Sequence, residues 1–188
     1  MINIKKTKEA SGGFFFPTFM LILFLIIFAY EYNTQMIYYT QISVEDSIAI
    51  STLASSCINL YEYEDFDKTS YTIINECYNI FVESFKINME LDDNLLPLEN
   101  SFASYLIAEP IIIKEYSYYC IKDGRVYKTT KNKTVNVDMG DIGDVKTPDG
   151  NIITEATIYV NLTIGLKNIF SNEVVYVDKC FTVDIVSE

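Results

Sequence analysis

The pattern of hydrophobic positions begins with an uninterrupted apolar run near the N-terminus. Residues 10–30 carry no charge, and the stretch from Phe14 to Tyr30 is almost wholly apolar. A helix needs about 20 such residues to cross the hydrocarbon core of a bilayer. The run therefore predicts a transmembrane helix over residues 14–30. A cleavable secretion signal and a buried core helix are the alternatives, but the apolar part of a signal usually spans only about 7–15 residues.

The charges on either side of this run predict its orientation. Lys5, Lys6 and Lys8 lie in a basic leader formed by residues 1–13, and Glu31 follows the run. Because positive residues stay on the cytoplasmic side of a membrane, we expect a cytoplasmic N-terminus and an extracellular C-terminal domain. The sequence thus indicates a single-pass protein of the cell membrane.

Helical character continues beyond the apolar run, because residues 30–63 contain neither glycine nor proline. Apolar residues recur there every three or four positions and predict one helix face: Ile50, Leu53, Cys57 and Leu60. A single helix over residues 14–61 would be on the order of 70 Å long. Its apolar stripe predicts a partner that covers it.

A second helix is predicted over residues 69–88. Its apolar residues also share one face: Ile74, Cys77, Phe81 and Phe85. The connection before it, residues 62–68, is short and acidic. We therefore expect an antiparallel pair of helices, an exported hairpin over residues 31–88.

From Ile111 onward the periodicity changes to two, which is typical of β-strands. Asp123-Gly124 signals a tight hairpin between the first two strands. In the last two strands these residues are expected to face the core: Ala156, Ile158, Val160, Leu162, Ile164, Val175, Val177, Phe181, Val183 and Ile185. The fold class is therefore α+β. The transmembrane helix extends into a long helix, a second antiparallel helix follows, and residues 89–188 form an antiparallel sheet of about 4–5 strands with one apolar face.

Composition and charge narrow the range of functions. The chain has 188 residues, a formal net charge of −12 and no histidine. Nucleic acid is excluded as a partner, because an acidic chain repels phosphate. The commonest general base is missing, and no phosphate-binding loop occurs. We therefore expect a protein that is not an enzyme and needs no cofactor.

The basic leader, the Gly13–Phe14 junction before an apolar helix, and a long helix leading into a β domain resemble type IV pilin-like proteins. Among these, the layout is most similar to the TadE-like pseudopilins of tight-adherence pili. The resemblance implies cleavage after Gly13 by a prepilin peptidase, so that Phe14 becomes the first residue. The helix is retained after cleavage. It first anchors the subunit in the membrane and later packs in the core of the filament or at its initiating tip. The implied partners are the membrane and, through the apolar helix, other pilin-like subunits or assembly-platform proteins.

The resemblance includes one departure from the family pattern. The family usually has a glutamate at the fifth position after the cut, where this chain has Thr18, preceded by Pro17. This departure favours a minor subunit or an uncleaved anchored relative over a major pilin.

Four cysteines in an exported domain suggest two disulfides. Cys57 lies near the end of the first helix and Cys77 early in the second, so an antiparallel hairpin would bring them together. Cys120 and Cys180 are each placed on the polar face of a strand, and we pair them as well. The alternative is four unpaired thiols. No Cys-x-x-Cys spacing or histidine indicates a zinc site.

A glycine-containing loop carries four acidic residues: Asp138, Asp141, Asp144 and Asp149. Such oxygen-rich loops suit Ca²⁺, which makes this loop a weak calcium candidate. The spacing is not that of an EF-hand, and a solvated loop is the preferred interpretation. We therefore predict no metal site.

Two hypotheses follow from the sequence. The first is a membrane-anchored, exported pilin-like subunit, a TadE-like minor pseudopilin that serves a pilus or secretion assembly. The second is a single-pass binding protein of the cell envelope that does not polymerise, and Thr18 supports it.

Overall fold

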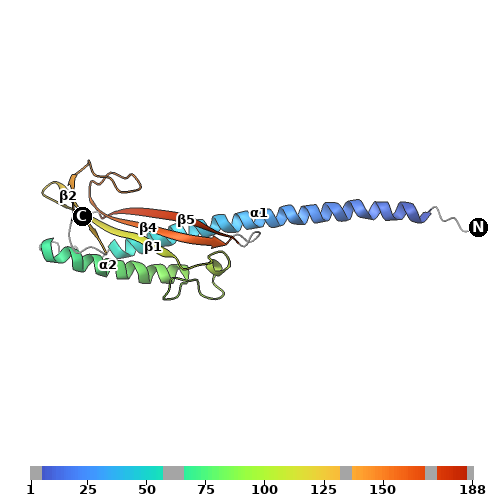
Figure 1. Ribbon diagram of the computed structural model, residues 1–188, viewed down its shortest axis with the longest axis horizontal. Helices are drawn as coiled ribbons and strands as arrows, with labels where there is room; N and C mark the ends of the chain where they lie inside the picture. The colour runs from blue at the N-terminus through green and yellow to red at the C-terminus, as the bar shows by residue number, and fades with distance from the viewer. Residues whose placement is uncertain (1–5, 57–65, 132–136, 168–172, 186–188) are drawn as a thin grey trace, which may run out of the picture. The chain divides into compact units, whose positions relative to one another are not determined.

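The structure is a computed structural model that describes residues 6–56, 66–131, 137–167 and 173–185. Two helices, α1 and α2, are followed by a short 3-10 helix (Phe102–Tyr105) and by strands β1 to β5 (Figure 1). The chain divides into two compact units, residues 1–40 and residues 41–188. We call the second unit the head. The α+β class predicted from the sequence is confirmed.

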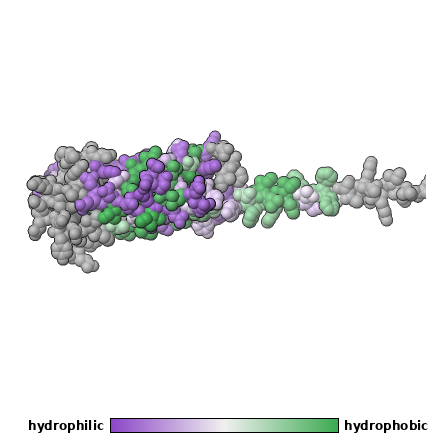
Figure 2. Space-filling model, turned by 90° about the horizontal axis from the view of Figure 1, so that it is seen from below, coloured by the Kyte–Doolittle hydropathy of each residue, from purple (hydrophilic) through white to green (hydrophobic). Residues whose placement is uncertain are grey.

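Helix α1 (Lys6–Ser56) is a single α-helix of 51 residues. In the first unit its large apolar side chains are exposed all around the helix: Phe14, Phe15, Phe16, Phe19, Met20, Leu21, Ile22, Leu23, Phe24, Leu25, Ile26, Ile27 and Phe28. Figure 2 shows this stretch as a mainly green segment. The helix is long and apolar enough to cross a membrane. A helix that is apolar on every side needs lipid or other apolar surfaces around it.

Within the head, α1 buries a face that consists mostly of small hydroxyl side chains: Val44, Ser47, Ile48, Ser51, Thr52 and Ser55. The apolar face predicted from the sequence lies elsewhere. Ile50 remains 54% exposed and Leu53 51% exposed. The head itself therefore does not cover these two residues, and a partner that covers the stripe stays a prediction. Cys57 and Leu60, the other members of that stripe, are outside the described residues.

Hydrogen bonding explains how a face of serines and threonines can be buried. Thr52 donates from Oγ1 to the carbonyl of Ile48, and Ser55 donates from Oγ to the carbonyl of Thr52, both at 2.7 Å. These two hydroxyls are thus paired within the helix, and burying them carries little desolvation penalty. Hydrophobic periodicity alone could not reveal this face.

Helix α2 (Phe66–Met89) buries the face predicted for it. Ile74, Cys77, Phe81 and Phe85 are between 0% and 7% exposed. The rings of Phe81 and Phe85 stack at 5.7 Å between centroids. Helices α1 and α2 run in opposite directions (Figure 1). They meet near the end of α2, where Asn88 Nδ2 lies 3.3 Å from Ser51 Oγ.

The sheet has five strands in the order β3-β2-β1-β4-β5, and all neighbours are antiparallel. The strands are β1 (Ile112–Lys122), β2 (Arg125–Thr130), β3 (Val137–Asp141), β4 (Ala156–Lys167) and β5 (Val174–Ile185). The predicted hairpin joins β1 to β2. Asp123 and Gly124 both have positive φ, 51° and 76°, as a type I′ turn requires.

Both faces of the sheet carry apolar clusters, so the prediction of one apolar face is wrong. On the helix-covered face, Tyr116, Ile158 and Leu162 belong to the same cluster as Phe81 and Phe85. On the other face, a second cluster gathers residues from β1, β2, β4 and the loop after β3: Tyr119, Val126, Val145, Ile153 and Tyr159. That loop packs down on the sheet, which explains why β4 is buried on both faces rather than half-buried.

Candidate functional site

The predicted processing site, Gly13–Phe14, lies inside α1. Pro17 stands four residues after Gly13 and has no N–H, so the usual helical hydrogen bond to the Gly13 carbonyl cannot form. Thr18 donates its hydroxyl to the carbonyl of Phe14 at 2.7 Å. A side chain added at Gly13 would meet no atom within 4 Å. The helix is thus weakened at the peptide bond that the resemblance marks for cleavage.

Tyrosines flank the charged residue that ends the apolar run. Tyr30 and Tyr32 are 62% and 58% exposed, one on each side of Glu31. Tyrosine is enriched where a membrane helix enters water, because its ring is apolar and its hydroxyl is polar. This position suits the exit of α1 from a bilayer.

Two polar contacts tie α1 to the sheet within the head. Tyr116 of β1 donates its hydroxyl to Ser55 Oγ at 2.9 Å. Burial raises the pKa of Tyr116, and the hydrogen bond with Ser55 only partly opposes that rise. Glu45 of α1 forms an ion pair with Lys179 of β5. These contacts fix α1 through its polar side and leave Ile50 and Leu53 uncovered.

The sequence predicts a Cys120–Cys180 disulfide because both cysteines are expected on the polar face of their strands. The structure places these two cysteines on opposite faces of the sheet. Cys120 packs in the cluster on the helix-covered face. Cys180 is exposed on the opposite face, because its register partner Asn161 alternates with the core residues Val160 and Leu162. Two strands that are separated by β4 and point their cysteines to opposite faces cannot form the bond. The Cys120–Cys180 prediction is therefore wrong.

Cys77 and Cys120 are both buried. Cys77 is a buried free thiol, and its predicted partner Cys57 lies outside the described residues. Burial is the main cause that raises the pKa of Cys77 to about 11, and burial also raises the pKa of Cys120 to about 11. Both thiols are thus neutral at physiological pH and behave as small apolar side chains.

The acidic loop does not bring its four carboxylates together. Asp138 and Asp141 both pair with Arg125, at 2.8 Å and 3.4 Å. Asp149 accepts a hydrogen bond from Thr182 at 2.7 Å and so ties the loop to β5. In the part of the chain that the structure describes, no three acidic, cysteine or histidine residues are gathered as a metal site. The loop covers the second face of the sheet.

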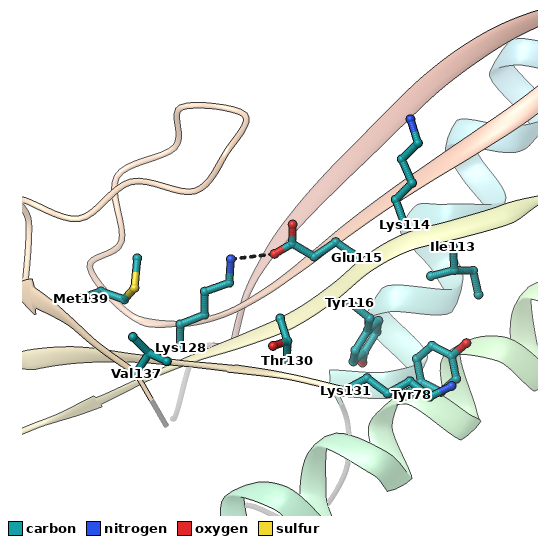
Figure 3. A pocket seen from close by; sticks show the side chains of 10 residues that line it. All are labelled: Tyr78, Ile113, Lys114, Glu115, Tyr116, Lys128, Thr130, Lys131, Val137 and Met139. Atoms are coloured by element: carbon teal, nitrogen blue, oxygen red, sulfur yellow. Dashed lines mark ion pairs between the residues drawn. The ribbon is translucent and has the colours of Figure 1, made fainter. Parts of the chain in front are cut away.

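Sequence reasoning missed a cleft of about 560 Å³ beside the first half of β1 (Figure 3). Residues 113–116 of β1 line it, together with Tyr78 of α2 and residues of β2 and β3. Lys128 Nζ lies 2.6 Å from Glu115 Oε1, and Lys131 Nζ lies 3.1 Å from the centre of the Tyr78 ring. No spacing in the sequence could signal this cleft, since it depends on where β2 departs from β1.

Comparison with known proteins adds no assignment. No protein-family model, curated protein or solved structure matches this chain significantly.

Proposed function

We propose that this chain is a membrane-anchored, exported structural subunit of a pilin-like assembly, of the TadE-like minor pseudopilin type. The observation that carries the proposal is that the two ends of α1 differ in composition and in packing. Its first part is apolar and exposed on every side, and its last part is fixed to an α+β head through serines and threonines. In this proposal the N-terminus lies in the cytoplasm and the head is extracellular.

The exposed apolar part of α1 requires an apolar environment. Each fully exposed Leu, Ile or Phe that becomes buried gains about 1.5–3 kcal/mol. Thirteen large apolar side chains lie exposed between Phe14 and Phe28. Lipid covers them while the subunit is anchored, and the helices of other subunits cover them once it is assembled.

The outer side of α1 offers a second contact to neighbouring subunits. Ile50 and Leu53 lie on the head portion of the helix, and each exposes about half of its surface. They occupy the side opposite Ile48 and Ser55, which pack on the head. A neighbouring helix or head can therefore bury them without disturbing the subunit.

A second candidate function is a single-pass envelope binding protein that does not polymerise. Thr18 favours it, because this residue is uncharged and its hydroxyl already bonds to Phe14 within the same helix. Such a residue offers no charge to a neighbouring subunit. We propose no enzymatic activity for either candidate.

The first experiment determines the mass of the mature N-terminus of the protein in native membranes. A start at Phe14 supports pilin-type processing. An intact Met1 supports the non-polymerising anchor, and a start beyond Tyr30 contradicts both candidates.

Photo-cross-linking then separates the two candidates. A photoreactive side chain placed at Ile50 should cross-link copies of the chain to one another. The matched control is the same group at Ile152, which is similarly exposed at 52% but lies in the loop after β3. Equal cross-linking at both sites, or none at Ile50, contradicts assembly through α1.

A further inference from the structure

One stretch of β1 has a strand neighbour on one side only. The ladder between β1 and β2 begins at Ser117, opposite Thr130, whereas β4 pairs with β1 from Ile112 onward. Across the described residues, no strand pairs with Ile112 to Lys114 on the β2 side. A strand edge of this kind presents backbone donors and acceptors to which another extended chain can add.

The cleft beside β1 lies against this edge, because Ile113 and Lys114 belong to the edge and also line the cleft. Its apolar lining includes Val137 and Met139 of β3, which are 44% and 43% exposed. Apolar and cationic side chains therefore stand close together beside a stretch of β1 that no other described strand covers. An extended peptide presents its side chains alternately to two sides, so it can meet both kinds of surface at once.

The charge of the cleft points to the chemistry of its ligand. Lys114 is already paired with Asp178, at 2.7 Å, and Lys128 with Glu115. Lys131 differs from them, because its ammonium rests on the Tyr78 ring and forms no ion pair with a carboxylate of the described residues. A ring contact stabilises a cation without neutralising its charge. A cation that keeps its charge in the lining of the cleft favours an acidic ligand.

We propose that the cleft binds a short, extended, carboxylate-bearing segment of another polypeptide. A carboxylate of the segment pairs with Lys131, its backbone continues the sheet beside Ile113, and its apolar side chains contact Val137 and Met139. The register shift between Ile113 and Glu115 interrupts the regular edge, so the added strand is short. The proposal concerns the head alone and stands independently of how α1 assembles.

The test uses the full chain in detergent micelles and a fluorescent hexapeptide of alternating valine and glutamate with blocked ends. Fluorescence anisotropy should show saturable binding. Lys131→Glu should weaken it by about tenfold or more, because a charge-assisted hydrogen bond is lost and a like charge replaces it. The matched control is Lys146→Glu, which makes the same charge change at an exposed lysine outside the cleft and should alter affinity by less than about twofold.

Two altered peptides separate the contributions of charge and strand pairing. Replacing glutamate by glutamine should weaken binding, since the carboxylate is lost. Replacing valine by proline should abolish it, because proline has no N–H to add to the strand edge. NMR shifts of the Ile113 and Val137 methyl groups during titration place the peptide without any variant. Equal effects of Lys131→Glu and Lys146→Glu, equal binding of the glutamine peptide, or unshifted methyl groups overturn the proposal.

Discussion

The hydroxyl of Tyr116 donates a hydrogen bond to Ser55 Oγ across 2.9 Å, and Ser55 donates in turn to the carbonyl of Thr52. Tyr116 belongs to β1, the central strand, and Ser55 lies near the end of α1. This chain of two hydrogen bonds joins the long helix to the middle of the sheet. It runs through a region in which Tyr116 is 3% exposed and Ser55 is 0% exposed.

We expect Tyr116→Phe to lower the free energy of unfolding of the head by about 1 kcal/mol, because a buried neutral hydrogen bond contributes about that much. Ser55→Ala should cost a similar amount. The double variant should cost less than the sum, since both changes remove the same bond. Urea unfolding in micelles measures all three. Tyr105→Phe, on a side chain that is 65% exposed, is the control and should leave stability unchanged.

Ile48 and Ile50 provide a matched test of the two sides of α1. Ile48 is 1% exposed and Ile50 is 54% exposed. Ile48→Ala should destabilise the head by about 2–4 kcal/mol through lost packing, whereas Ile50→Ala should stay within about 0.5 kcal/mol. In membranes, Leu53→Asp should leave the head folded and abolish the cross-linking between copies from a photoreactive group at Ile50. Unfolding of the Leu53→Asp variant would show that Leu53 supports the head itself.

Pro17 should control cleavage at Gly13–Phe14. Pro17→Ala restores an N–H to the Gly13 carbonyl and strengthens the helix at that point, by about 3 kcal/mol on propensity. We expect slower conversion to the form that starts at Phe14, followed by pulse-chase and mass spectrometry. Ala29→Pro is the complementary variant, since it weakens the helix far from the junction. It should leave the cleavage rate unchanged, and a faster rate would show that overall helicity, rather than the helix at the junction, limits cleavage.

The thiols should react in an order set by burial. At pH 8, iodoacetamide should modify the exposed Cys180 in the folded protein and spare Cys77 and Cys120, which are 7% and 3% exposed. The pKa values of Cys77 and Cys120 are raised from 9.0 to about 11. Above pH 9 the unfolded chain therefore loses thiol protons that the folded chain keeps. Stability should fall as pH rises from about 9 to 11. Mass mapping after alkylation and unfolding curves across this range are the measurements. Rapid labelling of Cys120 would contradict its buried position.

Residue patterns within short stretches of the sequence predicted helices and turns correctly where a single property, such as hydrophobic spacing or turn propensity, determines the local structure. The apolar run, the buried face of α2 and the Asp123-Gly124 hairpin all follow from residue types at fixed spacing. The buried face of α1 could not be predicted in this way. Ser51 accepts a hydrogen bond from Asn88 and Ser55 accepts one from Tyr116, partners that only the fold supplies, whereas hydrophobicity pointed to Ile50 and Leu53.

The two wrong predictions for the sheet, its single apolar face and the face of Cys120, both arise from contacts between residues far apart in the sequence. Alternation in β4 predicts one buried face, but Val145 and Ile153 fold back and cover the other face as well. The polar character of Tyr116 and Tyr118 placed Cys120 on the wrong face, because tyrosine can be buried when its ring packs and its hydroxyl finds a partner. The cleft beside Lys131 depends on the departure of β2 from β1, which no local pattern encodes.

The hydroxyl-rich seam between α1 and the head reverses the usual allocation of side chains in a surface helix. Few apolar side chains of α1 pack against the rest of the head. Ile50, Leu53 and the run from Phe14 to Phe28 remain exposed and available for contacts with other molecules. A single copy is therefore complete as a folded head but incomplete as a surface. A helix whose apolar side chains are exposed on every side needs an apolar environment to cover them.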